Sequence, residues 1–590
     1  MNVNNNNNVE IFGKGGGGKG GGGSARIAQE DPNNLQSNAV ARIIDLVGEG
    51  EIYGLVDGLK SVYIDNTPLQ NEDNTFNFSG VEIEERVGLT VQSHVGGFDG
   101  IEATTDVSTE ITTVDPVIRT ITNLSVDAVR LTLQLPSLSK QNAENGDLNE
   151  NEVSIAIDVR EQGGNWSQVK QDTISGKTTS PYQRSYRIDL NGVGPWDVRF
   201  RRITDDSDSS IINDKTYFAS YTTIIDSKLT YPDTAYIAFK VDAKQFGNSI
   251  PERAYHVRGL IVNVPDNYNP LTRQYTGLWG GNFKRAWSNN PAWIFYDLAT
   301  NKRYGAGLDN VDKWSLYQIG RYCDEFVDDG YGSTEPRFTI NTVLNTRDDV
   351  YNVLNSLSSA FMGMTYYGAG TITAVQDAPK NSSRVFTDAN VIGGEFKRSD
   401  SDIRTRHTRC AVSWNDPSNN FKLTTELVED SAALQKYGIQ TKEITAFGCT
   451  SRGQARRIGL WTLYTEQLET ETVEFSVGVA DADVRPGDVI SINDSSHVGY
   501  RLGGRLTSNN TANVLYLDKA PQNFTGDNKT ISLQMPDGSL VHKPVSSISD
   551  NVVTLSSSLN EAPLDNAAFA LSSSNVALQE FRVLARTQQE

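Results

Sequence analysis

Cysteine is scarce in this chain, and its scarcity excludes two classes of cross-linked protein. Only three cysteines occur among 590 residues, at Cys323, Cys410 and Cys449. Their spacing offers no CxxC pair for zinc or for redox exchange, and so sparse a set does not build a disulfide framework. We expect all three to be buried thiols, because free cysteine behaves as a small apolar residue.

Histidine is also rare, and the sequence shows no assembled catalytic or metal motif. The acidic run Asp205, Asp206 and Asp208 lacks the glycine and the final acid of a calcium loop, which favours a solvated loop. No GxSxG turn is present. None of the histidines stands three or four residues from another, as a helical zinc site requires. We therefore predict no enzyme activity, no catalytic residue, no metal and no cofactor. The five histidines are His94, His256, His407, His497 and His542.

Two short motifs resemble parts of active sites. The Gly-Lys-Thr triplet at 176–178 ends like a phosphate-binding loop, but Gln171 stands where that loop requires its first glycine. We predict a β-turn there. Cys449 and Ser451 precede a predicted helix, so they form either a thiol of lowered pKa or a helix cap beside a packed thiol. We favour the cap.

Long hydrophobic runs and an excess of positive charge are absent as well. No run approaches the roughly 18 apolar residues of a membrane helix, and the N-terminus has no signal-peptide core. We expect no integral membrane segment and synthesis in a cytoplasm. The net charge of −20 disfavours a surface that grips nucleic-acid phosphates. It suits a soluble protein, or a conduit wall along which DNA slides without specific binding.

The chain contains many short strands and a few helices. Val40, Ile43 and Ile44 stand at helical spacing and predict a short helix beginning near Asn38. Six alternating segments within residues 124–226 predict a β-sandwich. Residues 364–377 predict a strand pair. Further helices are predicted at 291–300, 311–326, 347–361 and 451–470.

Aromatic residues concentrate between Tyr255 and Trp314, interleaved with glycine and asparagine. Such a mixture suits a sugar-stacking groove or a protein interface, because aromatic side chains bury a large area at low entropic cost. We favour an interface. Its candidate residues are Trp279, Phe283, Trp287, Trp293 and Tyr296.

One segment of this aromatic region carries a family resemblance. VPDNYNPLTRQYTGLWGGNFKRAWSNNPAWIFYD (264–297) resembles the tip attachment protein J family of lambda-like phages, also called host specificity proteins. Further resemblances follow in the same order along the chain. They are GEGEIYGLVDGLKSVYIDNTPL (48–69), GKTTSPY (176–182), YTTIID (221–226), VDKWSLYQIGRYCD (311–324), TELVED (425–430) and AFGCTSRGQARRIGLW (446–461).

The resemblance implies a virion protein at the distal tail tip, a homotrimeric central hub that caps the tail tube, nucleates tail assembly and relays host attachment to genome ejection. The implied partners are the distal tail protein, the tape measure protein and tip-assembly proteins. The implied host receptor contact lies in a C-terminal extension or a separate fibre, because the sequence stops at FRVLARTQQE, about where the family's extension begins. A tail-associated cell-wall hydrolase and a glycan-binding adhesin are the alternatives.

The same resemblance assigns the segments of a multi-domain, mainly β protein with α+β modules. They are a flexible Gly-rich arm (1–34), the first part of a hub domain with a helix and strands (35–123), an inserted β-sandwich (124–226), the aromatic-rich continuation of the hub domain (227–310), an α+β hub module (311–400), a tail-tube-like hub module (401–480) and a C-terminal OB-like β-barrel (481–590).

Overall fold

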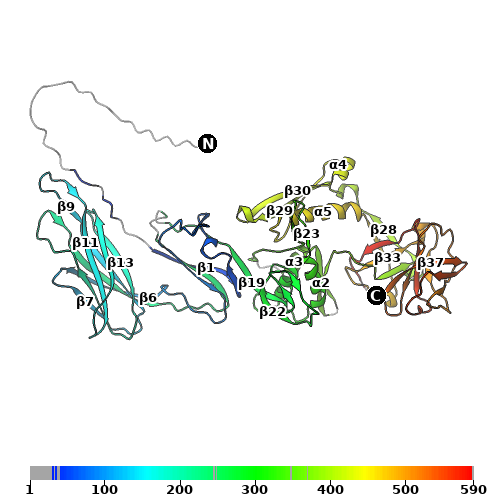
Figure 1. Cartoon of the computed structure of the whole chain (residues 1–590), viewed down its shortest axis with the longest axis horizontal. Helices are drawn as coiled ribbons and strands as arrows, with labels where there is room; N and C mark the ends of the chain where they lie inside the picture. The colour runs from blue at the N-terminus through cyan, green and yellow to red at the C-terminus, as the bar shows by residue number, and fades with distance from the viewer. Residues whose placement is uncertain are drawn as a thin grey trace, which may run out of the picture. The chain divides into compact units, whose positions relative to one another are not determined.

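The computed structural model of the chain describes residues 29–31, 33–35, 40–242, 246, 249–345, 349–368 and 370–587. The chain divides into two compact units, Met1–Arg258 and Gly259–Glu590. Strands dominate both units, and all six α-helices of the described residues lie in the second (Figure 1). The prediction of a mainly β protein with α+β modules is confirmed. The predicted flexible arm falls mostly outside the described residues.

The first unit consists of short sheets and a β-sandwich. Its strands are β1 (Val40–Glu49), β2 (Ile52–Leu55), β3 (Val62–Ile64), β4 (Thr67–Pro68), β5 (Val81–Val87), β6 (Asp99–Ile111), β7 (Val117–Ile121), β8 (Ala128–Leu135), β9 (Ser139–Gln141), β10 (Leu148–Asn149), β11 (Asn151–Glu161), β12 (Ser167–Gly176), β13 (Tyr182–Asp189), β14 (Trp196–Arg202), β15 (Ile212–Asn213), β16 (Thr216–Asp226), β17 (Thr234–Asp242) and β18 (Arg253–Tyr255).

The predicted helix near residue 40 is wrong, because β1 is a strand that pairs antiparallel with β17. Ile43 faces one apolar cluster of the first unit, whereas the next residue, Ile44, faces another. A strand covered on both faces carries apolar residues in succession, which hides the alternation that identifies a half-exposed strand. The resulting spacing of apolar residues imitates a helix.

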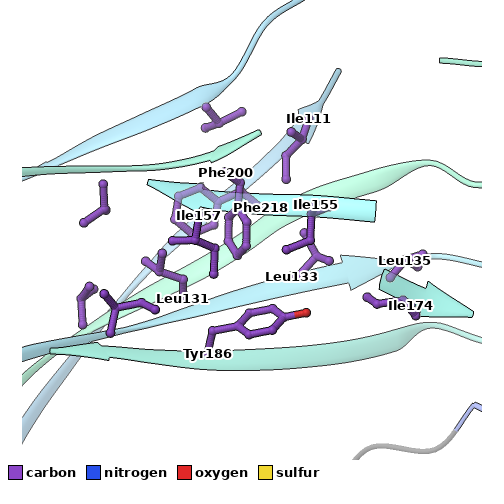
Figure 2. Close-up of a cluster of buried hydrophobic side chains, with 14 of the residues drawn as sticks. Ile111, Leu131, Leu133, Leu135, Ile155, Ile157, Ile174, Tyr186, Phe200 and Phe218 are labelled. Atoms are coloured by element: carbon purple, nitrogen blue, oxygen red, sulfur yellow. The ribbon is translucent and has the colours of Figure 1, made fainter. Parts of the chain in front are cut away.

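The predicted β-sandwich is present and consists of two four-stranded sheets, ordered β12-β11-β14-β7 and β13-β8-β16-β6. β6 and β7 precede residue 124 and belong to these sheets. Alternate side chains from both sheets fill the space between them (Figure 2). Phe200 and Phe218 meet edge to face at its centre, with ring centroids 5.0 Å apart. Each such buried ring contributes about 1.5–3 kcal/mol.

The sandwich is an insertion between two strands that pair with each other. β5 and β17 lie side by side in the sheet β1-β17-β5, and the whole sandwich lies between them in the sequence. Its first and last strands, β6 and β16, are also antiparallel partners, with Asp99 opposite Asp226. The chain therefore enters and leaves the sandwich at neighbouring positions.

The second unit begins within β19. Its elements are β19 (Val257–Pro265), β20 (Tyr268–Asn269), β21 (Gln274–Tyr275), β22 (Phe283–Trp287), α1 (Pro291–Thr300), α2 (Lys313–Asp324), β23 (Phe326–Asp328), β24 (Thr334–Pro336), α3 (Val350–Ser359), β25 (Gly363–Gly368), β26 (Thr371–Gln376), β27 (Arg384–Thr387), β28 (Lys397–Asp400), β29 (Arg409–Asp416), β30 (Lys422–Glu429), α4 (Ser431–Tyr437), β31 (Thr441–Thr445), α5 (Arg452–Leu468), β32 (Glu471–Glu474), β33 (Val489–Asn493), α6 (Ser495–Val498), β34 (Gly503–Arg505), β35 (Val514–Tyr516), β36 (Thr530–Gln534), β37 (Leu540–Ser549), β38 (Val552–Leu555), β39 (Ala568–Ser572) and β40 (Gln579–Arg582).

The helices predicted at 291–300, 311–326, 347–361 and 451–470 are confirmed as α1, α2, α3 and α5, and the predicted strand pair is β25–β26. Local caps explain this success, since Asp312 and Asp349 accept hydrogen bonds from the first amides of α2 and α3. α2 ends earlier than predicted, so Phe326 lies in β23 and is 60% exposed.

The C-terminal part forms a six-stranded antiparallel sheet ordered β34-β39-β36-β37-β38-β35. Leu506 and Leu517, which follow the two edge strands, form an antiparallel bridge that connects the edges. The sheet thereby closes around its own apolar core. Closure of this kind suits the predicted barrel, while its OB-like topology stays a prediction.

Candidate functional site

The five aromatic residues predicted to form a subunit interface lie in one module of the second unit. Trp293, in α1, is fully buried, and Trp279, which precedes β22, is 8% exposed. Phe283 and Trp287, at the ends of β22, and Tyr296, on α1, are half-buried. Trp279 and Trp293 therefore pack inside this chain. A contact with a second subunit stays a prediction for the other three residues.

Stacked rings connect the helices of this module through β22. Trp279 stacks on Tyr317 of α2, with centroids 4.8 Å apart and 13° between the planes. The edge of Phe283 meets Trp279 at 5.2 Å, and Phe283 stacks on Tyr296 of α1 at 4.3 Å. Each pair contributes about 0.5–1.5 kcal/mol beyond its buried area. The aromatic cluster thus holds the module together.

A buried carboxylate joins the ends of α1 and α2. Asp324, 5% exposed, accepts hydrogen bonds from Arg273 Nη1 at 2.7 Å, from the Tyr275 hydroxyl at 2.8 Å and from Asn290 Nδ2 at 2.8 Å. Burial raises the pKa of Asp324, and the neighbouring Arg273 opposes the increase. Asn290 is also the N-cap of α1. Because these groups satisfy one another, the network suits a structural role.

Two exposed apolar residues at the edge of this cluster were missed by the sequence analysis. Leu278 is fully exposed, and Trp314, at the start of α2, is 53% exposed although its ring meets Trp279 at 5.0 Å. A signal was available for Trp314, since it stands off the apolar stripe of the predicted helix. For Leu278 the sequence contained no signal of exposure, because Leu278 lies in a loop between glycine and aromatic residues.

A second module places α5 against the three-stranded sheet β30-β29-β31. Gly459 permits the close approach, since a Cβ there would lie 2.8 Å from a methyl group of Val428. Ser451 caps α5 by accepting a hydrogen bond from the Gln454 amide at 3.1 Å, which confirms the predicted helix cap. The Gln454 side chain then bonds the backbone of Thr339.

The faces of this second module turned away from its core carry exposed apolar side chains. On β30, Leu423 and Leu427 are 63% and 52% exposed, and β30 pairs with β29 on one side only. On α5, Trp461, Tyr464 and Leu468 stand at a spacing of three and four residues and are also exposed. The Trp461 indole donates a hydrogen bond to Asp377 Oδ2 at 2.7 Å, so part of this side chain already contacts its own chain. Exposed apolar side chains on a strand edge or a helix face are candidate surfaces for contact with another chain. We call these five residues the apolar faces.

The three thiols are buried, as predicted for the cysteines. Burial raises the pKa of Cys449 to about 11 and that of Cys410 to about 11, and it raises the pKa of Cys323. A thiol of raised pKa is protonated at neutral pH and is a poor nucleophile. The helix-cap interpretation of Cys449 and Ser451 is therefore favoured over the reactive thiol.

Another serine forms a hydrogen bond that resembles part of a catalytic dyad. Ser532 Oγ lies 2.7 Å from His542 Nδ1, beside a polar hollow of about 310 Å³ that Glu580 also lines. The two residues are direct partners across β36 and β37, so the bond is an ordinary cross-strand contact. Ser532 is completely buried, and its hydroxyl is not presented to a substrate.

The Gly-Lys-Thr triplet and the acidic run lie in surroundings that suit a structural role. The triplet at 176–178 leaves the end of β12 and leads into β13, without the helix that a phosphate site requires. Asp206 accepts a hydrogen bond from the Thr113 amide at 2.9 Å and lies 3.2 Å from Arg202. Throughout the described ranges, no three His, Cys, Asp or Glu side chains are arranged to hold a metal ion. Nor does any helix in those ranges have the length and apolarity needed to cross a membrane.

Comparison with known proteins finds phage tail proteins along most of the chain. Residues 101–227 match the family model described as the FNIII-A domain of tip attachment protein J, and residues 349–508 match a putative phage tail protein model. Tip attachment protein J of Escherichia phage SECphi27 is 35% identical over an alignment of 572 residues that covers 94% of this chain and 47% of that protein. The protein of the same description from Escherichia phage SECphi4 is 34% identical over 94% of this chain and 49% of its own length. The chain thus spans about half the length of these relatives.

Two solved structures show weaker similarity. A chain in the virion of a native gene transfer agent particle is 12% identical, with a TM-score of 0.31 over 58% of this chain and 66% of that one. Prophage tail protein gp18 from Listeria monocytogenes EGD-e is 12% identical, with a TM-score of 0.17 over 39% of this chain and 58% of its own.

Proposed function

Because this chain belongs to the tip attachment protein J family, we propose that it forms the trimeric central hub of a phage tail tip. The observation that carries the proposal is the identity to two tip attachment proteins over 94% of the chain, which includes both compact units. In this role the protein is a structural component of the virion. It caps the tail tube, nucleates tail assembly and relays host attachment to genome ejection.

The apolar faces support self-association. The exposed leucines lie on the outer face of the sheet, whereas the aromatic stripe of α5 lies on the other side of the same module. A subunit in a closed ring contacts two neighbours through different surfaces, and one module with two exposed apolar faces meets that requirement. We assign the β30 face to the contact with a second copy of the chain.

The other partners follow from the proposed position in the particle. A hub at the distal end of a tail contacts the distal tail protein, the tape measure protein and tip-assembly proteins. Host receptor contact belongs to a C-terminal extension or a separate fibre. The net charge of −20 supports passage of DNA through a lumen without specific binding, because acidic walls repel phosphates.

The decisive experiment is the native mass of the purified chain by light scattering, combined with negative-stain imaging. We expect three times the chain mass of 64.8 kDa and a ring with a central hole. Leu423→Glu combined with Leu427→Glu should reduce the mass to that of one chain, because charge in a buried contact is costly. Leu124→Glu is the control, since Leu124 is 62% exposed and belongs to the first compact unit, whereas β30 belongs to the second.

The same preparation tests the alternatives. A wild-type monomer, or a trimer unaffected by the β30 substitutions, would contradict the proposed contact. Release of soluble sugar or peptide from purified cell walls would favour the hydrolase. Saturable binding of surface glycans by the monomer would favour the adhesin.

A further inference from the structure

A short segment that precedes the first strand contacts the edge of the sandwich. Glu30 forms a parallel bridge with Leu148 of β10. The Leu148 amide donates to the Gln29 carbonyl oxygen at 2.9 Å, and the Asp31 amide donates to the Leu148 carbonyl oxygen at 3.0 Å. The segment thus pairs with β10, the edge strand of a small sheet, β10-β9-β15, formed by segments that connect the sandwich strands, in the manner of an added strand. We call residues 29–31 and 33–35 the docking segment.

The lysine of the Gly-Lys-Thr triplet lies against this segment. Lys177 is 1% exposed, and its ammonium donates to the carboxylate of Glu30 and, at 3.0 Å, to Asn33 Oδ1. Both acceptors belong to the docking segment. A buried ammonium is stable only when charged or polar groups satisfy it. The sandwich thus contributes a cation, and the docking segment contributes its counterion.

The glycine of the triplet allows the backbones to approach. Gly176 has a φ of +144°, and a Cβ there would lie 2.4 Å from Asn34 Oδ1 and 2.9 Å from Leu35 Cγ. The same Asn34 oxygen accepts a hydrogen bond from the Lys177 amide at 2.7 Å, and the Asn34 amide donates to the Lys177 carbonyl oxygen at 3.1 Å. Leu35 packs against the apolar core of the sandwich.

We propose that this edge of the sandwich is a peptide-recognition site whose ligand is the docking segment of the same chain. The site selects an extended peptide by three features, namely a carboxylate for Lys177, an asparagine for the backbone at 177, and a leucine for the core. The Gly-Lys-Thr triplet therefore recognises a peptide carboxylate instead of a phosphate. This inference concerns the sandwich alone and does not depend on the proposed hub function.

Hydrogen–deuterium exchange on the full chain tests the site through the Leu148 amide, whose acceptor is the Gln29 carbonyl. Lys177→Met should accelerate exchange in the fragment that contains Leu148 by about ten-fold, the change produced by a loss of about 1.4 kcal/mol of stabilisation. Lys170→Met is the matched control, since Lys170 is an exposed lysine on β12. It should leave exchange unchanged.

Two substitutions in the docking segment repeat the test without changing the sandwich, so misfolding of the sandwich cannot explain their effect. Glu30→Gln removes the counterion, and Asn34→Ala removes the acceptor of the Lys177 amide, without altering a sandwich residue. Both should accelerate exchange at Leu148 and leave exchange in β8 at the wild-type rate. Wild-type exchange at Leu148 in both variants would overturn the proposal.

Discussion

Asp324 and Arg273 form an ion pair in the interior of the aromatic module, with 2.7 Å between Oδ1 and Nη1. The carboxylate is buried and comes from the end of α2, whereas the guanidinium comes from the loop between β20 and β21. Removal of one partner leaves the other charge uncompensated. The pair therefore offers a sensitive test of the packing described above.

Arg273→Met should lower the free energy of unfolding by about 3–5 kcal/mol, the usual cost of leaving one charge of a buried pair without its partner. The combined variant Arg273→Met and Asp324→Asn should lose less, because no buried charge remains. Urea unfolding followed by tryptophan fluorescence measures both. An equal decrease in the free energy of unfolding in the two variants would show that the uncompensated charge does not cause the destabilisation.

The decrease in stability caused by Arg273→Met should depend on pH. Burial raises the pKa of Asp324 in the folded protein, and Arg273 opposes this increase. A raised carboxyl pKa means that the folded state holds its proton more tightly than the unfolded chain, so stability falls as pH rises between the two pKa values. Without Arg273 that fall should be steeper. When the pH is lowered from neutral toward the ordinary aspartate pKa of about 3.9, unfolding of the variant should show partial rescue of its stability by acid.

Asp45 should show the opposite dependence on pH. The hydrogen bond from Arg253 lowers its pKa, burial opposes this, and the Tyr255 hydroxyl lowers it further. A lowered carboxyl pKa contributes stability above the unfolded pKa of about 3.9, and that contribution disappears as pH falls through the folded value. Thermal unfolding should show wild type more stable than Asp45→Asn near neutral pH, with the difference vanishing in acid. The exposed control Asp208→Asn should show no such trend.

Gly459→Ala should destabilise the second unit, although alanine is the better helix former by about 1 kcal/mol. The added methyl group would lie 2.8 Å from Val428 Cγ2 and 3.0 Å from Val412 Cγ2, and overpacking of this kind costs about 1–3 kcal/mol. Urea unfolding measures the balance. Thr465→Ala, on α5 but outside the apolar faces, is the control for helix propensity. A more stable Gly459→Ala protein would show that helix and sheet pack loosely.

The three thiols should be unreactive in the folded protein. Cys323, Cys410 and Cys449 are buried, and their raised pKa values keep them protonated. A thiol reagent at pH 8 should modify none of them within minutes, and all three after denaturation. Rapid modification of Cys449 in the native protein would restore the reactive-thiol interpretation.

The sequence correctly predicted the elements whose signals lie in neighbouring residues. Its predictions were wrong where contacts between distant residues determine the secondary structure. Ser451 and Asp349 predict the start of a helix because each side chain accepts a hydrogen bond from a backbone amide two or three residues further along the chain. β1 was misassigned because Ile43 and Ile44 each face a different cluster, which only the complete sheet provides. Five aromatic residues were predicted from the sequence to form an interface between subunits, and that contact stays a prediction. Trp293 points into the chain's own core because it packs against α2. No local pattern predicts which two elements pack against each other.

The sandwich lies between β5 and β17, and its two ends lie opposite each other at Asp99 and Asp226. For the sheet that it interrupts, the whole sandwich is equivalent to a hairpin loop. A cassette with adjacent ends can be lost, enlarged or exchanged by recombination without shifting the register of β5 and β17. The junction of β5 and β17 can therefore accept a sandwich of another size without a change in the pairing of the sheet around it.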